Sequence, residues 1–572
     1  MRVEEMGYPI GHANFSDIIR SGDTFVDKTL FIKELLHASE KVTLITRPRR
    51  FGKTLNLSMI QHFFAEEMYG QKTAGLFDGL KIDQVGGDYV QRYQGQFPVI
   101  FITLKDVKAL QFNQAHALVY EQIKKSFKQH LYLLDSEHLL AYEKVAFQKV
   151  LEGERDTDGL NSSLYDLSEY LYKHHRKRAW ILIDEYDSPM HEAYAGGYWE
   201  EMSALMKSLM GTTLKDNPFL ERGVITGILR IAKENMFSDL NHIKPYTILD
   251  NRYSQYFGFT ETEVDALIRT AENPISAENV KAWYNGYHFG SSVVYNPWSI
   301  MNCLDGGGIL KPYWINTSSN SMIAPLIKTL PLSALKQLYQ LAKGESTNGQ
   351  ITEALSLLQI ETNESAFWTL MVMAGYINAE LIPQDEQEAE ELPAKLSLPN
   401  KEVRIFFRSM IQRWLSARSG NPTRHNLFLD LLNGETCKFS QKLEWMLNAL
   451  VGQHDVTHQT QEAFYHGFML GTASLLSDKD YLVESNQESG RGRFDIAIIP
   501  KDLSKPGAVI ELKAVKNPER MAEAAQHAHD QIKSLAYTTD LQKRGVKEII
   551  QIGIGFHRKD FAIYPEPEDE WS

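Results

Sequence analysis

The segment from Thr46 to Thr54 has the residue types and spacing needed to hold the phosphates of a nucleotide. It reads Thr-Arg-Pro-Arg-Arg-Phe-Gly-Lys-Thr and lies between an apolar run at 42–45 and a helix-like run at 55–60. In such a loop, backbone N–H groups and the helix N-terminus bind the phosphates, Lys53 neutralises the β- and γ-oxygens, and the Thr54 hydroxyl ligates Mg²⁺. The residues that we assign to ATP and Mg²⁺ binding in this loop are Arg49, Arg50, Gly52, Lys53 and Thr54.

The loop departs from the usual phosphate-binding pattern at its first position. Arg47 stands where that pattern has glycine. A bulky residue there can change how the loop closes on the phosphates. The sequence therefore predicts nucleotide binding and leaves hydrolysis open.

A second motif ends in two acids. The apolar run 179–183 is followed by Asp184 and Glu185. In a nucleotide hydrolase, the first carboxylate holds Mg²⁺ through water and the second orients or deprotonates the attacking water. The alternative is a buried strand with acids at its solvated end. Because this motif follows the loop in the expected order, the two together predict an ATP site.

A third group of residues could cut a phosphodiester bond. Asp495 begins an apolar run to 499, and the next such run, 507–514, carries Glu511 and Lys513. Residues two apart on a strand point to the same face. Two carboxylates on adjacent strands can share Mg²⁺, and a neighbouring lysine can orient or activate the attacking water. The alternative is an edge strand with solvated charges.

These motifs require a sheet to position them. Over 41–260, short apolar runs alternate with helix-like segments, which predicts a parallel sheet with helices on both faces. The expected strands are 42–46, 99–104, 180–184 and 223–228. Ligands bind at the C-terminal ends of the strands in such sheets. The phosphate-binding loop, Asp184 and Thr226 all fall at these ends.

The remaining chain divides in two. Residues 261–450 are mostly helical by pattern, and their acidic run 383–391 is expected to be an exposed hairpin or loop, or else a patch that binds a partner. From about 461 the pattern changes to helix, strand, strand, helix, strand. We therefore expect an α/β protein with three domains, at 1–260, 261–450 and 451–572.

Composition narrows the class of protein. The 572 residues carry a net charge of −13, so any contact with nucleic acid must use local basic patches. Only two cysteines occur, Cys303 and Cys437, which excludes a disulfide framework and a cysteine zinc site. The N-terminus lacks the apolar segment of a signal peptide, and no apolar run is long enough to span a bilayer. We expect a cytoplasmic protein.

The C-terminal motif resembles that of PD-(D/E)XK nucleases, with Phe494 where proline is conventional. Gln531 and Tyr537 resemble the glutamine–tyrosine motif that follows the active site in RecB-like nucleases. His466 is either a further ligand or DNA contact, or a core or capping histidine. A local basic patch that could hold phosphates is formed by Arg491, Arg493, Lys513 and Lys516.

The whole chain resembles the bacterial AAA-ATPase-like proteins that carry a C-terminal PD-(D/E)XK nuclease-like domain. The motifs that carry this resemblance lie at 25–29, 47–54, 182–189, 226–234, 256–260, 283–289, 295–299, 485–486 and 488–495. The resemblance implies a P-loop NTPase of the AAA+/STAND-like branch, a helical lid or winged-helix-like middle region, and a restriction-endonuclease-like module. It also implies that Arg47 is the family's own usage.

The resemblance suggests roles for further residues. Thr226 is expected to act as a sensor of the nucleotide, and Arg230 to be a nearby charge or a structural salt bridge. Three aromatic residues could stack on a base, although helix packing is the alternative that we favour; they are Trp283, Tyr284 and Tyr287.

The function that these expectations favour is an ATP-regulated, Mg²⁺-dependent nuclease or nucleic-acid-processing enzyme. The alternative is a nucleotide-dependent switch or scaffold whose nuclease-like domain only binds nucleic acid or protein. A third hypothesis is an ATPase whose C-terminal domain is only structural. The sequence does not distinguish DNA from RNA. It leaves open a homo-oligomeric ring, with an arginine supplied in trans, or a STAND-like monomer or dimer.

Overall fold

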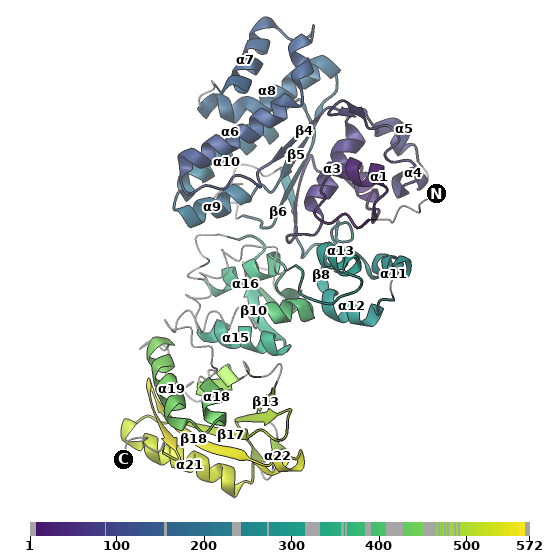
Figure 1. Cartoon of the computed structure of the whole chain (residues 1–572). Helices are drawn as coiled ribbons and strands as arrows, with labels where there is room; N and C mark the ends of the chain where they lie inside the picture. Colours follow the sequence, from purple (N-terminus) through teal and green to yellow (C-terminus); the bar gives the residue numbers. More distant parts are fainter. Residues whose placement is uncertain are drawn as a thin grey trace. The chain divides into compact units, whose positions relative to one another are not determined.

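A computed structural model gives the fold of the chain (Figure 1). It falls into two compact units, one containing residues of 1–326 and 344–406 and the other residues of 327–343 and 407–572. The residues that the structure describes are 7–85, 87–153, 157–231, 242–271, 274–314, 332–355, 360, 363–383, 391–407, 427–450, 465–466, 469–470, 472–473, 476, 480–485, 488–489 and 492–566.

The first unit contains a five-stranded sheet with the order β4-β5-β6-β1-β7, in which every neighbouring pair is parallel. The four predicted strands are confirmed, with ends shifted by three residues or fewer. The strands are β1 (Val42–Thr46), β4 (Val99–Thr103), β5 (Ala179–Asp184), β6 (Leu220–Gly227) and β7 (Ile243–Tyr246). All residues of β1 and β5 are buried, as expected for a parallel sheet that is covered on both faces.

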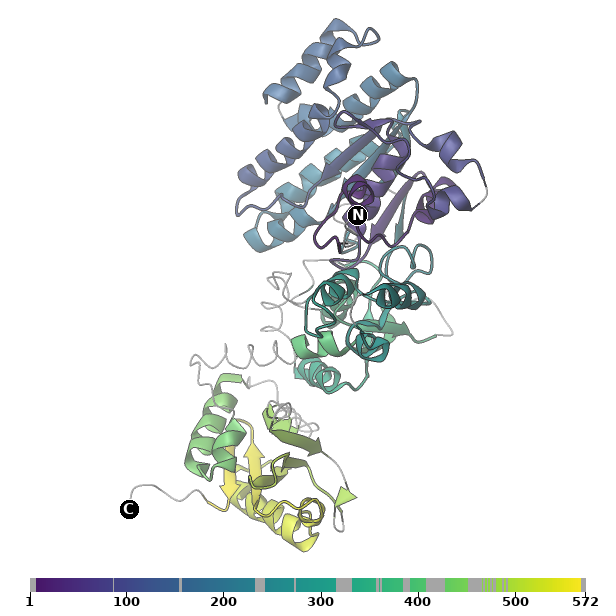
Figure 2. The same ribbon diagram turned by 45° about the vertical axis from the view of Figure 1, so that its right-hand side comes forward.

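Helices cover both faces of this sheet. Figures 1 and 2 show α1 and α3 on one face and α6, α8 and α10 on the other. On the α3 face, the ring of Phe64 stacks on that of Trp180 with centroids 3.9 Å apart. The helices are α1 (Phe15–Ser21), α2 (Leu30–Leu36), α3 (Lys53–Phe64), α4 (Lys81–Gln84), α5 (Tyr89–Tyr93), α6 (Phe112–Lys128), α7 (Ala141–Glu152), α8 (Thr157–His175), α9 (Ser188–Gly196) and α10 (Trp199–Leu214).

The register of the strands aligns their C-terminal ends. Thr103 pairs with Asp184, and Ile45 pairs with Thr226. Strand β6 lies between β1 and β5, so Thr226 stands between the phosphate-binding loop and Asp184. The predicted gathering of these residues at one edge of the sheet is confirmed.

The middle region is divided: residues of 261–326 and 344–406 belong to the first unit, and residues of 327–343 and 407–450 belong to the second. It is helical as predicted, and it contains strands as well: β10 and β11 each pair antiparallel with β12, and β8 pairs with β9. Strand β10 reads Thr-Asn-Gly-Gln-Ile, which has no apolar alternation to reveal it in the sequence. The elements are α11 (Glu261–Thr270), α12 (Ala277–Tyr284), β8 (Tyr287–Phe289), β9 (Ser292–Val294), α13 (Pro297–Asp305), β10 (Thr347–Ile351), α16 (Glu364–Met373), β11 (Asn378–Leu381) and β12 (Leu392–Ser397). Most of the acidic run, at 384–390, lies outside the described residues.

The second unit contains a five-stranded sheet with the order β13-β16-β17-β18-β19. The predicted hairpin is present, because β16 pairs antiparallel with β17. Helix α21 packs closely on β18, where a Cβ atom at Gly553 would lie 2.1 Å from the Ala525 carbonyl oxygen. The elements are α15 (Leu332–Lys343), α18 (Leu427–Leu432), α19 (Thr436–Leu450), β13 (Tyr481–Ser485), β14 (Glu488–Ser489), β15 (Gly492–Arg493), β16 (Ile496–Pro500), β17 (Gly507–Ala514), α21 (Met521–Ser534), α22 (Thr539–Lys543), β18 (Ile549–His557) and β19 (Asp560–Tyr564).

Within the described part of the chain, no helix combines the length and the apolar character that crossing a bilayer requires.

Candidate functional site

The phosphate-binding loop connects β1 to α3 and is closed by its own lysine. Gly52 precedes the helix with a φ of 80°, a backbone conformation that glycine adopts without strain. The Lys53 ammonium donates to the carbonyl oxygens of Arg47 and Pro48, both at 2.9 Å. Burial lowers the pKa of Lys53, and the nearby carboxylate of Glu185 opposes this effect. Phosphate oxygens could replace the two carbonyls as acceptors for this ammonium.

Asp184 links the loop to the centre of the sheet. Its buried carboxylate accepts hydrogen bonds from the hydroxyls of Thr54, at 2.8 Å, and Thr226, at 2.7 Å. These three predicted residues therefore meet around one side chain. A carboxylate and a hydroxyl beside the start of a helix are hard oxygen donors of the kind that Mg²⁺ takes together with water and phosphate. The donor set fits a magnesium–nucleotide site.

Glu185 stands next to this centre in a special backbone conformation. Its φ is 50°, which is uncommon for a residue other than glycine. Burial raises the pKa of Glu185, while Lys53 opposes the rise and Asp184 and Asp187 add to it. A carboxylate with a raised pKa is better suited to accept a proton from water than an ordinary one.

Asp187 holds the segment that follows β6, a role that the sequence analysis did not assign. Its carboxylate accepts the backbone N–H groups of Ile228 and Leu229, both at 2.8 Å. The His191 Nε2 atom lies 3.5 Å from the same carboxylate, and burial lowers the pKa of that imidazole. A third acid at 187, soon after Asp184 and Glu185, was the feature of the sequence that could have pointed to this residue.

Arg47, the departure from the usual loop pattern, points into the protein. Its guanidinium is fully buried and donates to the carbonyl oxygens of Thr46, at 2.8 Å, and Tyr246, at 3.1 Å. It also lies over the rings of Phe257 and Phe289. Burial lowers the pKa of Arg47 to about 9. Arg47 thus connects the start of the loop to β7, and its side chain points away from the side of the loop that would bind phosphate.

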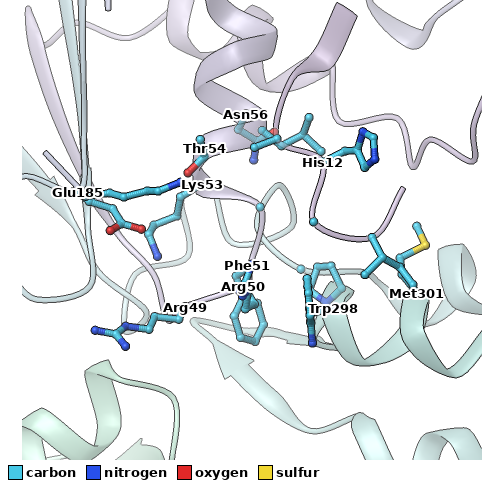
Figure 3. A pocket seen from close by; sticks show the side chains of 18 of the residues that line it. His12, Arg49, Arg50, Phe51, Lys53, Thr54, Asn56, Glu185, Trp298 and Met301 are labelled. Carbon is cyan, nitrogen blue, oxygen red and sulfur yellow. The ribbon is translucent and has the colours of Figure 1, made fainter. Parts of the chain in front are cut away.

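A cavity of about 930 Å³ opens along the loop (Figure 3). Its lining includes all five residues that we assigned to the nucleotide in the loop, together with Glu185. At the other end are His12 from the N-terminal segment and Trp298 and Met301 from α13. The cavity has room for a nucleotide whose phosphates lie at Lys53 and whose base lies toward α13.

One aromatic residue that lines this cavity is Trp298, which lies in the 295–299 motif but had no predicted role. The Arg50 guanidinium lies over its ring, 4.1 Å from the centroid. Trp283, Tyr284 and Tyr287 are absent from the described lining of the cavity. Tyr284 and Tyr287 are buried, which agrees with the packing alternative.

A buried carboxylate, Glu402, joins two walls of the cavity. It accepts the backbone N–H of Trp314 at 2.6 Å and the hydroxyl of Ser299, on α13, at 2.8 Å. The Trp314 indole N–H in turn donates to the Arg49 carbonyl oxygen at 3.1 Å. Burial raises the pKa of Glu402 to about 7. The sequence pattern gave no signal for this residue.

Arg230 forms the salt bridge that was its structural alternative. Its guanidinium lies 3.0 Å from Glu353 Oε2. Its carbonyl oxygen accepts the N–H of Leu355 at 2.8 Å. The segment after β6 therefore contacts the residues that directly follow β10.

In the second unit, the hairpin brings Asp495, Glu511 and Lys513 together. The Asp495 backbone N–H donates to Glu511 Oε2 at 3.3 Å, and the Leu512 N–H donates to Asp495 Oδ2 at 2.8 Å. The Lys513 ammonium lies 3.2 Å from Glu511 Oε1. Glu511 is only 2% exposed. Burial and the charge of Asp495 raise its pKa to about 7, and Lys513 opposes the rise.

This carboxylate pair fits a hard cation. Two close carboxylates repel each other, and a bound divalent ion removes that repulsion. Among the described residues, no group of three or more His, Cys, Asp and Glu side chains could hold a metal ion. The pair would therefore hold Mg²⁺ with water and backbone oxygens in the remaining positions, as is common for this ion.

The structure also shows where some of the other predicted residues of this domain lie. His466 Nε2 lies 3.1 Å from both the Asp495 carbonyl oxygen and the Ser485 hydroxyl. The Gln531 side-chain amide donates to the Tyr537 hydroxyl at 3.1 Å. Lys516 is exposed, whereas Arg491 and the Arg493 side chain lie outside the described residues.

The raised pKa of Glu511 predicts a pH-dependent cost to stability. The folded state keeps this proton up to about pH 7, whereas the unfolded chain releases it near the ordinary glutamate pKa of 4.5. Stability contributed at this site therefore falls as pH rises between these values. We expect Glu511→Gln, in EDTA, to protect the β16 and β17 amides from hydrogen exchange by about 3 kcal/mol at pH 8 and by almost nothing at pH 4.

The exposed Glu519→Gln is the matched control and should change neither value. Equal protection of the wild-type chain and Glu511→Gln at pH 8 would contradict the burial of this carboxylate.

Comparison with known proteins gives two family matches and one relative. Residues 9–237 match the model described as "Predicted AAA-ATPase", and residues 460–566 match that of the PD-(D/E)XK nuclease superfamily. A protein of Azotobacter chroococcum mcd 1, described as "Uncharacterized protein in vnfD 5'region", is 25% identical over 571 residues, which cover 97% of each chain. No solved structure gives a significant match.

Proposed function

We propose, from the premise that this chain joins an AAA-ATPase-like domain to a domain of the PD-(D/E)XK nuclease superfamily, that it is an ATP-regulated, Mg²⁺-dependent nuclease. The observation that carries the nuclease proposal is the meeting of Asp495, Glu511 and Lys513 at the end of one hairpin. Burying the Glu511 carboxylate costs free energy of folding. A catalytic role would explain why two carboxylates and a lysine are kept together despite this cost.

The proposed ATP site uses residues with separate tasks. Lys53 and the first N–H groups of α3 bind phosphate oxygens. Thr54 and Asp184 would hold Mg²⁺, which neutralises charge on the β- and γ-oxygens when bound. Glu185 would orient the attacking water and take its proton, and Thr226 fixes the Asp184 carboxylate in place.

The proposed nuclease site works in a similar way. Asp495 and Glu511 would hold Mg²⁺, which stabilises charge on the scissile phosphate when bound. Lys513 would orient the attacking water and stabilise the charge that develops on the phosphate. Nucleic acid is the partner that this chemistry implies. The sequence has only two cysteines, Cys303 and Cys437, and this low number supports a cytoplasmic location.

The test is a cleavage assay with single- and double-stranded DNA and RNA. The full chain is incubated with Mg²⁺ or Mn²⁺, with and without ATP, beside Glu511→Ala. We expect cleavage that requires the metal, disappears in Glu511→Ala and changes with ATP.

Each other outcome has a meaning. Cleavage that persists in Glu511→Ala would assign the activity to a contaminant. Cleavage unaffected by ATP would remove the regulatory part of the proposal. Absence of cleavage on every substrate would favour a nucleotide-dependent switch whose C-terminal domain only binds.

A further inference from the structure

The two arginines in the middle of the phosphate-binding loop have different surroundings. Arg50 has a φ of 68°, and its guanidinium stacks on Trp298 at the α13 end of the cavity. The Arg49 side chain extends instead to the side on which Glu185 lies (Figure 3). Consecutive residues of one loop thus face opposite ends of the cavity.

The surroundings of Arg49 are those expected of the terminal phosphate. Lys53, Thr54 and Glu185 line the same cavity, and in the proposed site the attacking water lies between Glu185 and the γ-phosphorus. Burial raises the pKa of Glu185, and the Arg49 charge, like that of Lys53, opposes the rise. Arg49 therefore acts electrostatically on the group that would face the attacking water.

The backbone of Arg49 is fixed while its side chain is available. The Trp314 indole holds the Arg49 carbonyl oxygen at 3.1 Å. Over the described residues, the Arg49 guanidinium forms no hydrogen bond or ion pair, in contrast to Arg47, which donates to buried carbonyls. A half-buried guanidinium without such a partner at the mouth of a phosphate site is ready to take an anionic oxygen.

We propose that Arg49 is a catalytic arginine supplied in cis, which binds the γ-phosphate oxygens and stabilises their charge during ATP hydrolysis. This inference rests on the proposed ATPase. In the step itself, water attacks the γ-phosphorus and gives a proton to Glu185. The bond from that phosphorus to the β–γ bridging oxygen breaks, and its electron pair leaves on ADP.

The assignment has a consequence for assembly. In nucleotide hydrolases without such an arginine, a partner protein can supply it, and it then raises kcat by about 10³- to 10⁵-fold. With Arg49 in its own loop, one chain is complete for hydrolysis. Turnover per chain should therefore be independent of protein concentration.

The test compares Arg49→Ala with the wild-type full chain in steady-state ATP hydrolysis. We expect kcat to fall about 10²- to 10³-fold, with partial recovery in Arg49→Lys. ATP affinity should fall while ADP affinity stays unchanged, because only ATP has the γ-phosphate. Arg178→Ala, an exposed arginine at the opposite end of β5, is the matched control and should hydrolyse ATP as the wild type does.

A mixing experiment separates cis from trans. Arg49→Ala keeps Lys53, and Lys53→Ala keeps Arg49, so a trans arrangement would recover activity when the two variants are mixed. We expect no recovery. Recovery would overturn the cis assignment, and an unchanged kcat in Arg49→Ala would overturn the catalytic one.

The failure of the underlying ATPase is recognised separately. Wild-type chain that binds ATP without turnover would overturn hydrolysis, and the role of Arg49 in it, while leaving nucleotide binding in place. Wild-type turnover with an unaffected Arg49→Ala variant would overturn the role of Arg49 alone.

Discussion

Replacing Lys53 by alanine is expected to weaken ATP binding by at least about 10²-fold, or about 3 kcal/mol. Lys53 is 5% exposed and lies where the helix N-terminus and the loop converge. A hydrogen bond to a charged group contributes about 1.5–3 kcal/mol, more than one between neutral groups, and this lysine would make several to the β- and γ-oxygens. Titration of a fluorescent ATP analogue into the full chain measures the effect.

The same lysine also closes the empty loop, so the alanine variant has two effects. It leaves the carbonyl oxygens of Arg47 and Pro48 without their donor. Lys53→Gln keeps an N–H donor for these oxygens and removes only the charge, so it should bind ATP nearly as poorly and unfold as the wild type does.

Lys41→Ala serves as the control for both variants. It removes an exposed lysine at the other end of β1 and should leave the ATP affinity unchanged. Wild-type affinity in both Lys53 variants would show that this loop does not bind the phosphates.

Replacing Lys513 by alanine is expected to reduce nucleic-acid cleavage by at least about 10³-fold and to leave ATP binding intact. Two losses combine. The variant lacks the charge that would stabilise the transition state at the phosphate. It also lacks the cation that holds down the pKa of Glu511, which burial and Asp495 already raise to about 7. Less of that carboxylate is then ionised at neutral pH, and metal binding weakens.

The pH dependence separates these two losses. Raising the pH to about 9 ionises Glu511 again, so Lys513→Ala should recover Mn²⁺ affinity in calorimetric titration. Cleavage should stay low, because the lysine is still missing. Recovery of cleavage together with metal affinity would show that Lys513 acts only through Glu511.

Lys505→Ala is the matched control for this experiment. It removes a lysine that pairs with Asp480 at 3.0 Å, just before β17 begins. Cleavage and metal affinity should match the wild type at each pH.

Much of the fold and of the candidate sites could be predicted from the sequence, because the predicted site residues lie at or near the ends of apolar strands. The strands of the first sheet are short apolar runs, and Gly52, Lys53 and Thr54 after such a run are typical of a phosphate-binding loop. The period of two in a strand was enough to put Glu511 and Lys513 on one face, and the hairpin brought Asp495 beside them.

The tertiary structure decided what periodicity does not encode. The order of strands placed Thr226 between Thr54 and Asp184, and this order depends on packing between segments far apart in the chain. The strands of the middle region, such as β10, are held by their partners and have no apolar alternation of their own.

The directions of the three loop arginines show the same division. The sequence determined that positive charge gathers around the phosphate-binding loop. Only the packed structure decided that Arg47 points into the core, Arg50 lies on Trp298 and Arg49 extends to the side of Glu185. The Tyr246 carbonyl holds Arg47 and the Trp298 ring holds Arg50, and these neighbours come from distant segments that meet the loop only after the chain has folded.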